Sequence, residues 1–106
     1  METTACGMDV IEARGLPEAP LDAAAQFSNK VVPIVRADIK SGCIVLFDPA
    51  DHTHDAWRYA AIAELAREAA PGRVNAIVGS SVDTIRETLS FLESAPGVTG
   101  QVFKLA

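Results

Sequence analysis

The chain has few of the features that would assign it to a special class of protein. It contains only two cysteines, Cys6 and Cys43, which cannot form a disulfide framework and lack the spacing of metal ligands. We expect both to be free thiols in a reducing cytoplasm. No apolar run approaches the ~20 residues needed to span a bilayer, and the N-terminus lacks the pattern of a signal peptide. These absences predict a cytoplasmic protein without membrane association.

Basic residues are also few and are scattered along the chain. Nine Lys and Arg stand against 14 Asp and Glu, which gives a net charge of -5 and argues against a nucleic-acid-binding surface. Aromatic residues make up only 6%, whereas hydrophobic residues make up 49% and are mainly Ala, Val, Ile and Leu. A chain of 106 residues buries roughly two thirds of its unfolded surface in one core. We therefore expect a single domain over residues 1–106, with 1–7 as a flexible leader.

Strand-like and helix-like segments alternate along the chain. Short apolar or β-branched runs predict strands, and longer segments with helical periodicity or many alanines predict helices. The alternation is typical of a parallel sheet with crossover helices on both faces. We therefore predict a small three-layer Rossmann-like α/β domain of about four parallel strands. The expected strands are 8–12, 43–47, 73–78 and 98–105, and the expected helices are 21–39, 53–70 and 82–95.

Several details of the helices follow from single residues. Pro33 leaves two alternatives open, a helix broken near this residue or a helix followed by an extended segment. Ser80 and Asp83 have the spacing of a capping box, and Val82 is expected on the apolar stripe of the last helix. Two further expectations concern polar residues: Asn75 should tie down the backbone of a neighbouring element, and the helical arginines should lie on solvated faces or in surface ion pairs. These arginines are Arg36, Arg58, Arg67 and Arg86.

Residues 48–55, with the sequence DPADHTHD, contain both histidines and three aspartates. The segment follows the expected strand 43–47 and precedes a helix, and open α/β sheets bind ligands at this position. Three interpretations are open: a metal site with His52, His54 and Asp51 as candidate ligands; a helix start capped by Asp51 or Thr53; or a polar pocket with titratable histidines. The candidate pocket residues are Asp48, Asp51, His52, His54 and Asp55.

Two stretches of the C-terminal half, ELAREAAPGRVNAIVGSSVDT and FLESAPGVTGQVFKLA, resemble the short-chain dehydrogenase/reductase family. In that family an Ala-rich helix leads to Arg-Val-Asn-Ala, and a later helix ending in Phe-Leu precedes Thr-Gly-Gln and the last strand. The segments before them are similar to the family's fourth strand, fourth helix and fifth strand. The resemblance covers most of residues 9–106 and implies the C-terminal half of a Rossmann-like fold.

The chain departs from the family at every element of its chemistry. Nothing resembles the Gly-rich Thr-Gly-x-x-x-Gly-x-Gly turn that holds the dinucleotide pyrophosphate at a helix N-terminus. Counting back from Pro71 places Asp51 and Asp55 where the family has its Tyr-x-x-x-Lys pair, and two carboxylates reverse the charge of that site. Ala13-Arg14-Gly15 replaces the Asn-Asn-Ala-Gly motif, and no Ser follows strand 43–47. Thr84 alone keeps a cofactor-type position, so we predict neither catalytic residues nor a cofactor.

The resemblance and its gaps favour a non-catalytic domain that acts by self-association or by binding another protein. The alternatives are an oxidoreductase or nucleotide-binding protein with altered site residues, and a small metal-binding protein centred on His52 and His54. The family dimerises through its fourth and fifth helices, which implies a homodimer built on the Ala-rich helix 53–70. Trp57 and Ala61 are the candidate interface residues.

Overall fold

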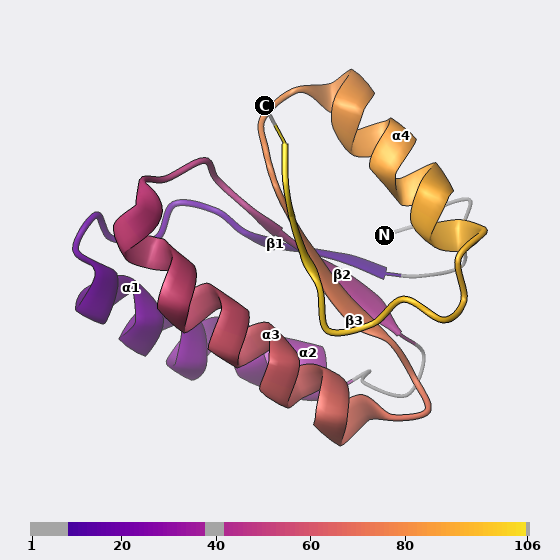
Figure 1. Ribbon diagram of the computed structural model, residues 1–106. Helices are drawn as coiled ribbons and strands as arrows, with labels where there is room; N and C mark the ends of the chain where they lie inside the picture. Colours follow the sequence, from indigo (N-terminus) through magenta and orange to yellow (C-terminus); the bar gives the residue numbers. More distant parts are fainter. Residues whose placement is uncertain (1–8, 38–41, 106) are drawn as a thin grey trace.

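The four strands form one parallel sheet in the order β1-β2-β3-β4 (Figure 1). The computed structural model describes residues 9–37 and 42–105. The strands are β1 (Asp9–Ala13), β2 (Cys43–Phe47), β3 (Val74–Val78) and β4 (Val102–Lys104). Strand order therefore follows chain order, with β1 and β4 at the two edges. The predicted parallel sheet of four strands is confirmed.

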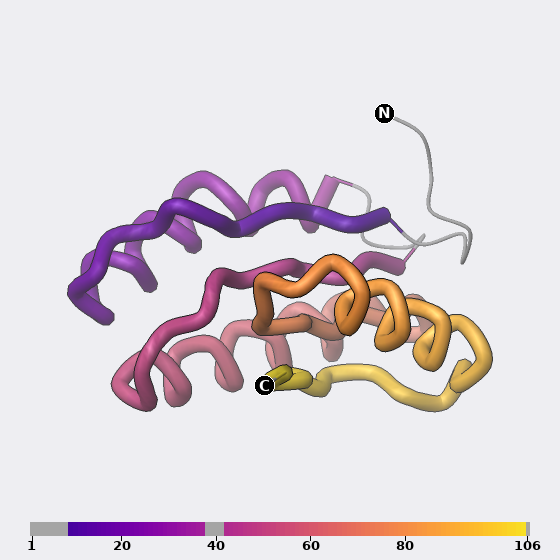
Figure 2. Tube along the Cα trace, turned by 90° about the horizontal axis from the view of Figure 1, so that it is seen from above, coloured from indigo at the N-terminus to yellow at the C-terminus, as the bar shows by residue number. Residues whose placement is uncertain are grey.

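The helices form a layer on each face of the sheet. On one face lie α1 (Pro20–Gln26), the π-helical turn Phe27–Val31, α2 (Val32–Ala37) and α3 (Asp55–Ala69). The other face carries α4 (Val82–Glu93). Figure 2 shows α4 on the opposite side of the strands from α1, α2 and α3. The predicted three-layer Rossmann-like arrangement is therefore confirmed, and none of the described helices is long and apolar enough to cross a membrane.

Pro33 lies inside a helix, so the alternative of an extended segment is wrong. Proline offers no amide hydrogen and its ring crowds the preceding helical turn. The chain accommodates it with a wide π-helical turn just upstream, in which the Val32 amide donates to the Phe27 carbonyl, five residues back. The helix continues through α2 as far as Ala37. An irregular but unbroken helical path thus covers residues 20–37.

The central strands β2 and β3 are buried at every position, as continuous apolar runs in a parallel sheet should be. Their side chains alternate between two apolar clusters. Val45, Phe47 and Ala76 pack under the π-helical turn, α2 and α3. Ile44, Leu46 and Ile77 pack against α4. Each fully buried Val, Ile, Leu or Phe side chain contributes about 1.5–3 kcal/mol, so this double packing holds both helical layers on the sheet.

The start of α4 differs from the sequence prediction by one residue. The cap is Ser81, whose backbone is extended and whose hydroxyl accepts from the Thr84 amide at 3.4 Å, so the expected Ser80–Asp83 box is wrong. Val82 is 64% exposed and does not belong to the stripe that packs on the sheet, because the apolar contacts of α4 begin one turn later at Ile85.

Asn75 has the structural role that the sequence predicted. It is fully buried in β3, and its side-chain amide donates to the Val98 carbonyl at 3.0 Å while its oxygen accepts from the Gln101 amide at 3.0 Å. These bonds hold the segment that leads into β4. The expected leader 1–7 with Cys6, the strand start at Met8 and the helix end at Ile39 lie outside the described residues.

Candidate functional site

The segment 48–55 leaves β2 and turns into α3 through a 3-10 turn, His52–His54. Asp51 precedes this turn and caps it, since its carboxylate accepts from the Thr53 amide at 3.0 Å and from the Thr53 hydroxyl. These two bonds, the hydroxyl first, hold the pKa of Asp51 below its ordinary value. The Asp51 carboxylate is therefore ionised and committed to the helix start.

Asp48 is bound at both of its carboxylate oxygens. Arg14 Nη1 donates to Oδ1 at 2.9 Å, and the Gly15 amide donates to Oδ2 at 2.9 Å. Arg14 Nη2 also reaches the Gly79 carbonyl at 3.3 Å, so one guanidinium joins the ends of β1, β2 and β3. Gly15 has φ +73°, a left-handed conformation that favours glycine. A single arginine thus links the carboxyl ends of three of the four strands, and we call this arrangement the arginine clip.

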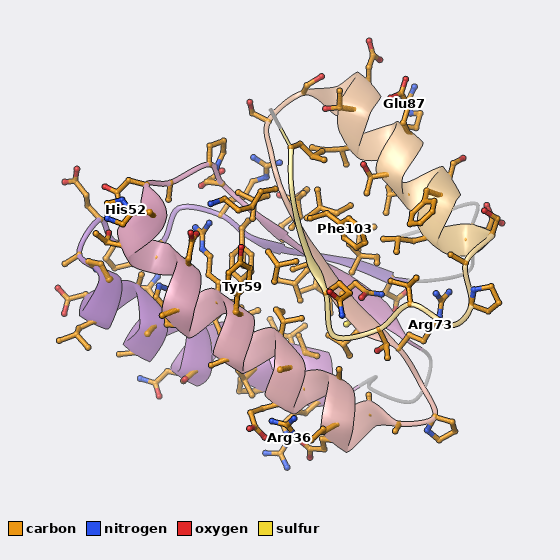
Figure 3. The ribbon with its side chains drawn as sticks, viewed as in Figure 1. Arg36, His52, Tyr59, Arg73, Glu87 and Phe103 are labelled. Atoms are coloured by element: carbon orange, nitrogen blue, oxygen red, sulfur yellow. The ribbon has the colours of Figure 1, made fainter. Side chains whose placement is uncertain are left out.

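His54 is buried, with both ring nitrogens engaged. The Trp57 indole can only donate, and its Nε1 lies 3.1 Å from His54 Nδ1, so Nδ1 accepts. The proton of the neutral ring therefore lies on Nε2, which donates to the Glu18 carbonyl at 2.9 Å. This histidine fastens the β1–α1 loop to the start of α3. His52, by contrast, is exposed in the 3-10 turn just before α3 begins (Figure 3).

The five candidate pocket residues do not converge on one point. Asp55 turns toward β4, where its oxygens accept from Lys104 Nζ at 3.0 and 3.2 Å. Asp48, Asp51 and His54 line one cavity, whereas His52 and Asp55 are not part of its lining. Over residues 9–37 and 42–105, the structure contains no group of three or more His, Cys, Asp or Glu that could hold a metal ion.

The cavity has a volume of about 320 Å³ and lies between the β1–α1 loop, the β2–α3 loop and α3. Its lining includes Arg58, which was expected on a solvated helix face or in a surface ion pair. That expectation is wrong, because Arg58 is only 6% exposed. The guanidinium carbon lies 4.4 Å from the Phe47 ring centroid and 5.7 Å from that of Trp57. Stacking on these rings holds the charged group inside the helical layer.

Arg58 lacks a direct polar partner at one donor. Its Nε is buried and has no hydrogen-bond partner within the described part of the chain. Burial lowers the pKa of Arg58, and the charges of Asp55 and Asp48 act in the opposite direction. A guanidinium nevertheless remains charged at neutral pH. The burial of Arg58 could have been predicted from its position in the helix. It has helical spacing with Ile62, Leu65 and Ala69, which are also buried in α3.

The two candidate interface residues lie along the side of α3 that meets α1 and α2. Trp57 is partly buried, with its ring centroid 5.3 Å from that of Phe27 and 5.6 Å from that of Phe47. Ala61, also partly buried, lines a groove of about 550 Å³ between α3 and the helical segment before it. Tyr59 is 45% exposed (Figure 3).

Thr84 stands in the first turn of α4 and is engaged within its own helix start. Its hydroxyl donates to the Ser81 carbonyl at 3.2 Å, and its amide donates to the Ser81 hydroxyl. It is not among the residues that line the Arg58 cavity. The candidate cofactor-type residue Thr84 therefore does not share the cavity lined by Asp48, Asp51 and His54.

A family model described as SDR-like, short chain dehydrogenase-like protein, matches residues 11–105. The chain belongs to this family. A search of curated proteins found no match, and a search of solved structures found none either. The family assignment agrees with the strand order, in which four parallel strands adjoin in the order of the chain. It confirms the resemblance drawn from the C-terminal half of the sequence.

Within this SDR-like chain, the positions aligned with the Tyr-x-x-x-Lys pair carry two engaged carboxylates. Asp51 is held by Thr53, and Asp55 is held by Lys104. A proton donor must still carry its proton at neutral pH. The pKa of Asp51 is lowered, so its carboxylate is ionised at neutral pH and has no proton to donate. The arrangement is suited to fixing the start of α3 on the sheet.

Proposed function

We propose that this SDR-like chain is a non-catalytic domain that acts by self-association. The observation that carries the first half of the proposal is the arginine clip, in which Arg14 binds Asp48 and the Gly79 carbonyl across three strand ends. Open α/β sheets bind ligands beyond these ends, and here Arg14 spans three of them outside the lining of the Arg58 cavity. The engaged states of Asp51 and Asp55 support the same conclusion.

The layer of α1, α2 and α3 supports self-association. It carries three large exposed apolar side chains, with Leu21 85%, Ile34 56% and Tyr59 45% exposed, while α4 carries Val82 and Phe91. Ala56 and Ala60 on α3 are also exposed, and small residues allow a second helix to approach closely. Exposed apolar groups gathered on one layer mark interaction surfaces more often than scattered ones do. We assign the dimer contact to this layer.

The groove that Ala61 lines combines apolar and charged residues. Val32, Ala61 and Leu65 supply apolar surface. Two charged pairs also line it, Arg36 with Glu68 at 2.7 Å and Arg67 with Glu64 (Figure 3, Arg36). An apolar centre with a polar rim is the usual anatomy of a protein interface. The seam of the proposed two-fold dimer therefore passes Ala61, with Trp57 one helical turn away, and light scattering at micromolar concentration tests it.

Nicotinamide dinucleotides are expected not to bind tightly. The phosphate-holding turn is absent from the sequence, and Arg14 spans the strand ends where a ring would lie. Calorimetric titration with oxidised and reduced NAD and NADP should give no saturable heat at micromolar concentration. A dissociation constant below about 10 μM, near -7 kcal/mol, would contradict the proposal and favour a nucleotide-binding protein with altered residues.

Reduction of carbonyl substrates is expected to be absent. Asp51 and Asp55 cannot replace a tyrosine proton donor and its lysine, because the Asp51 carboxylate accepts from Thr53 and the Asp55 carboxylate accepts from Lys104. Spectrophotometric assays with a panel of ketones and aldehydes and either reduced cofactor should give the rate of the buffer alone. Turnover that disappears in the Asp51→Ala, Asp55→Ala double variant would show that these carboxylates do act, and the non-catalytic assignment would then fail.

A further inference from the structure

The cavity beside Arg58 is lined by a buried charged side chain. Arg58 Nε has no hydrogen-bond partner in the described residues and almost no accessible surface, so other atoms of Arg58 line the cavity, and a buried charged group left without a partner is destabilising. Neutral aromatic rings flank the guanidinium. Although Asp48 and Asp55 lie close enough to act on its charge, neither forms an ion pair with it within 4.0 Å in the described part of the structure.

The three aspartates near Arg58 are engaged elsewhere, and the exposed Glu18, which also lines the cavity, forms no ion pair with Arg58 in the described part of the chain. Asp48 is neutralised by Arg14, Asp55 pairs with Lys104, and Asp51 caps the start of α3. The buried charge of Arg58 therefore lacks a dedicated counter-ion, although the cavity that it lines is large enough for a small molecule. A guanidinium matches the planar fork of a carboxylate and binds it through parallel N–H···O bonds.

The remaining lining selects the kind of anion. Leu16, Pro17 and Ala50 give the cavity an apolar part, which suits a short hydrocarbon tail. Asp48, Asp51 and Glu18 also line the cavity, and like charges repel an anion more strongly as its own charge rises. A singly charged carboxylate can pair with Arg58, and these acidic residues repel it less than they repel a phosphate, which carries nearly twice the charge.

We propose that this cavity binds a small monocarboxylate with a short apolar tail, and that Arg58 is its binding residue. The carboxylate accepts from the terminal guanidinium nitrogens of Arg58, because Nε has almost no accessible surface, and fills the cavity between the β1–α1 and β2–α3 loops. Since the cavity and the Ala61 groove share no lining residue, the site stands whether or not the chain self-associates.

Nuclear magnetic resonance titration of ¹⁵N-labelled protein tests the site, with butyrate as the probe and inorganic phosphate as its comparison. Butyrate is expected to shift the Arg58 Nε–H resonance and the amides of 50–54 with one saturable curve. The expected dissociation constant is about 1 mM or lower. An absence of saturable shifts at Arg58, or tighter binding of phosphate than of butyrate, would overturn the proposal.

Three variants separate the site from general arginine effects. Arg58→Met and Arg58→Lys are expected to weaken butyrate binding at least about tenfold, because the first removes the charge and the second removes the planar fork. Arg86→Met changes an exposed arginine of α4 that lines neither the cavity nor the Ala61 groove and should leave the constant unchanged. Circular dichroism monitors folding. If Arg58→Met does not fold, the proposal is tested by butyrate binding to Arg58→Lys and by the Arg58 Nε–H resonance of the wild type. An unchanged butyrate affinity in Arg58→Lys would contradict the assignment of Arg58 as the binding residue.

Discussion

The Phe47→Ala variant is expected to lose about 3–5 kcal/mol of its free energy of unfolding. Phe47 is completely buried at the end of β2, and its ring contacts those of Phe27 and Trp57 at centroid distances of 5.4 and 5.6 Å. It also supports the Arg58 guanidinium. Removing the ring leaves a cavity where α1, α3 and the sheet meet. The free energy of unfolding of a domain of this size is only about 5–15 kcal/mol in total, so the variant loses a large part of its stability.

Urea denaturation followed by circular dichroism measures this effect, and Phe91→Ala is the matched control. Phe91 is 52% exposed on α4, where it meets Phe103 edge to face at 6.1 Å. Its loss should cost no more than about 1.5 kcal/mol. Equal costs for the two variants would contradict the position of the core that the structure gives.

The Ala61→Glu variant is expected to convert the proposed dimer into a monomer. Ala61 lines the groove on the face of α3 that meets α1 and α2, so a two-fold contact there would bring a pair of buried like charges together. An unpaired charge in a closed interface costs several kcal/mol. A loss of this size raises a micromolar dissociation constant to about the millimolar range, so the variant is monomeric at micromolar concentration. Light scattering after size exclusion measures the molar mass.

The matched control for Ala61→Glu is Ser90→Glu. Ser90 is exposed on α4, on the other face of the sheet, and the substitution adds the same charge. Its dimer should remain intact. If Ala61→Glu left the dimer unchanged while its helix content was preserved, the interface would have to lie elsewhere, and the Ala61 seam would be wrong.

Most of the fold was predictable because its signals are local. The run Cys43–Phe47 is bounded by Gly42 and Asp48, and such an apolar run reads as a buried strand from neighbouring residues alone. Pro33 could not be decided locally, because a π-helical turn upstream, seen in the Val32–Phe27 hydrogen bond, relieves its clash. The cap of α4 was misplaced by one residue, since adjacent Ser80 and Ser81 offer the same hydroxyl.

The candidate site was less predictable because its contacts join distant segments. The contacts of Arg14 with Asp48 and Gly79 form only at the end of the folded sheet. The spacing of these residues in the sequence does not predict them. His54 and Asp48 were recognised as polar residues at a strand end, but their partners were not. Arg58 was missed because it was classified by its charge, although it shares the periodicity of the buried residues of α3.

The molar mass of the wild-type chain tests the central claim most directly. Multi-angle light scattering at micromolar concentration should give twice the chain mass of 11.2 kDa, with a lower mass on dilution as expected for reversible association. A particle of 11.2 kDa at every concentration up to the solubility limit would contradict self-association as the function of this domain.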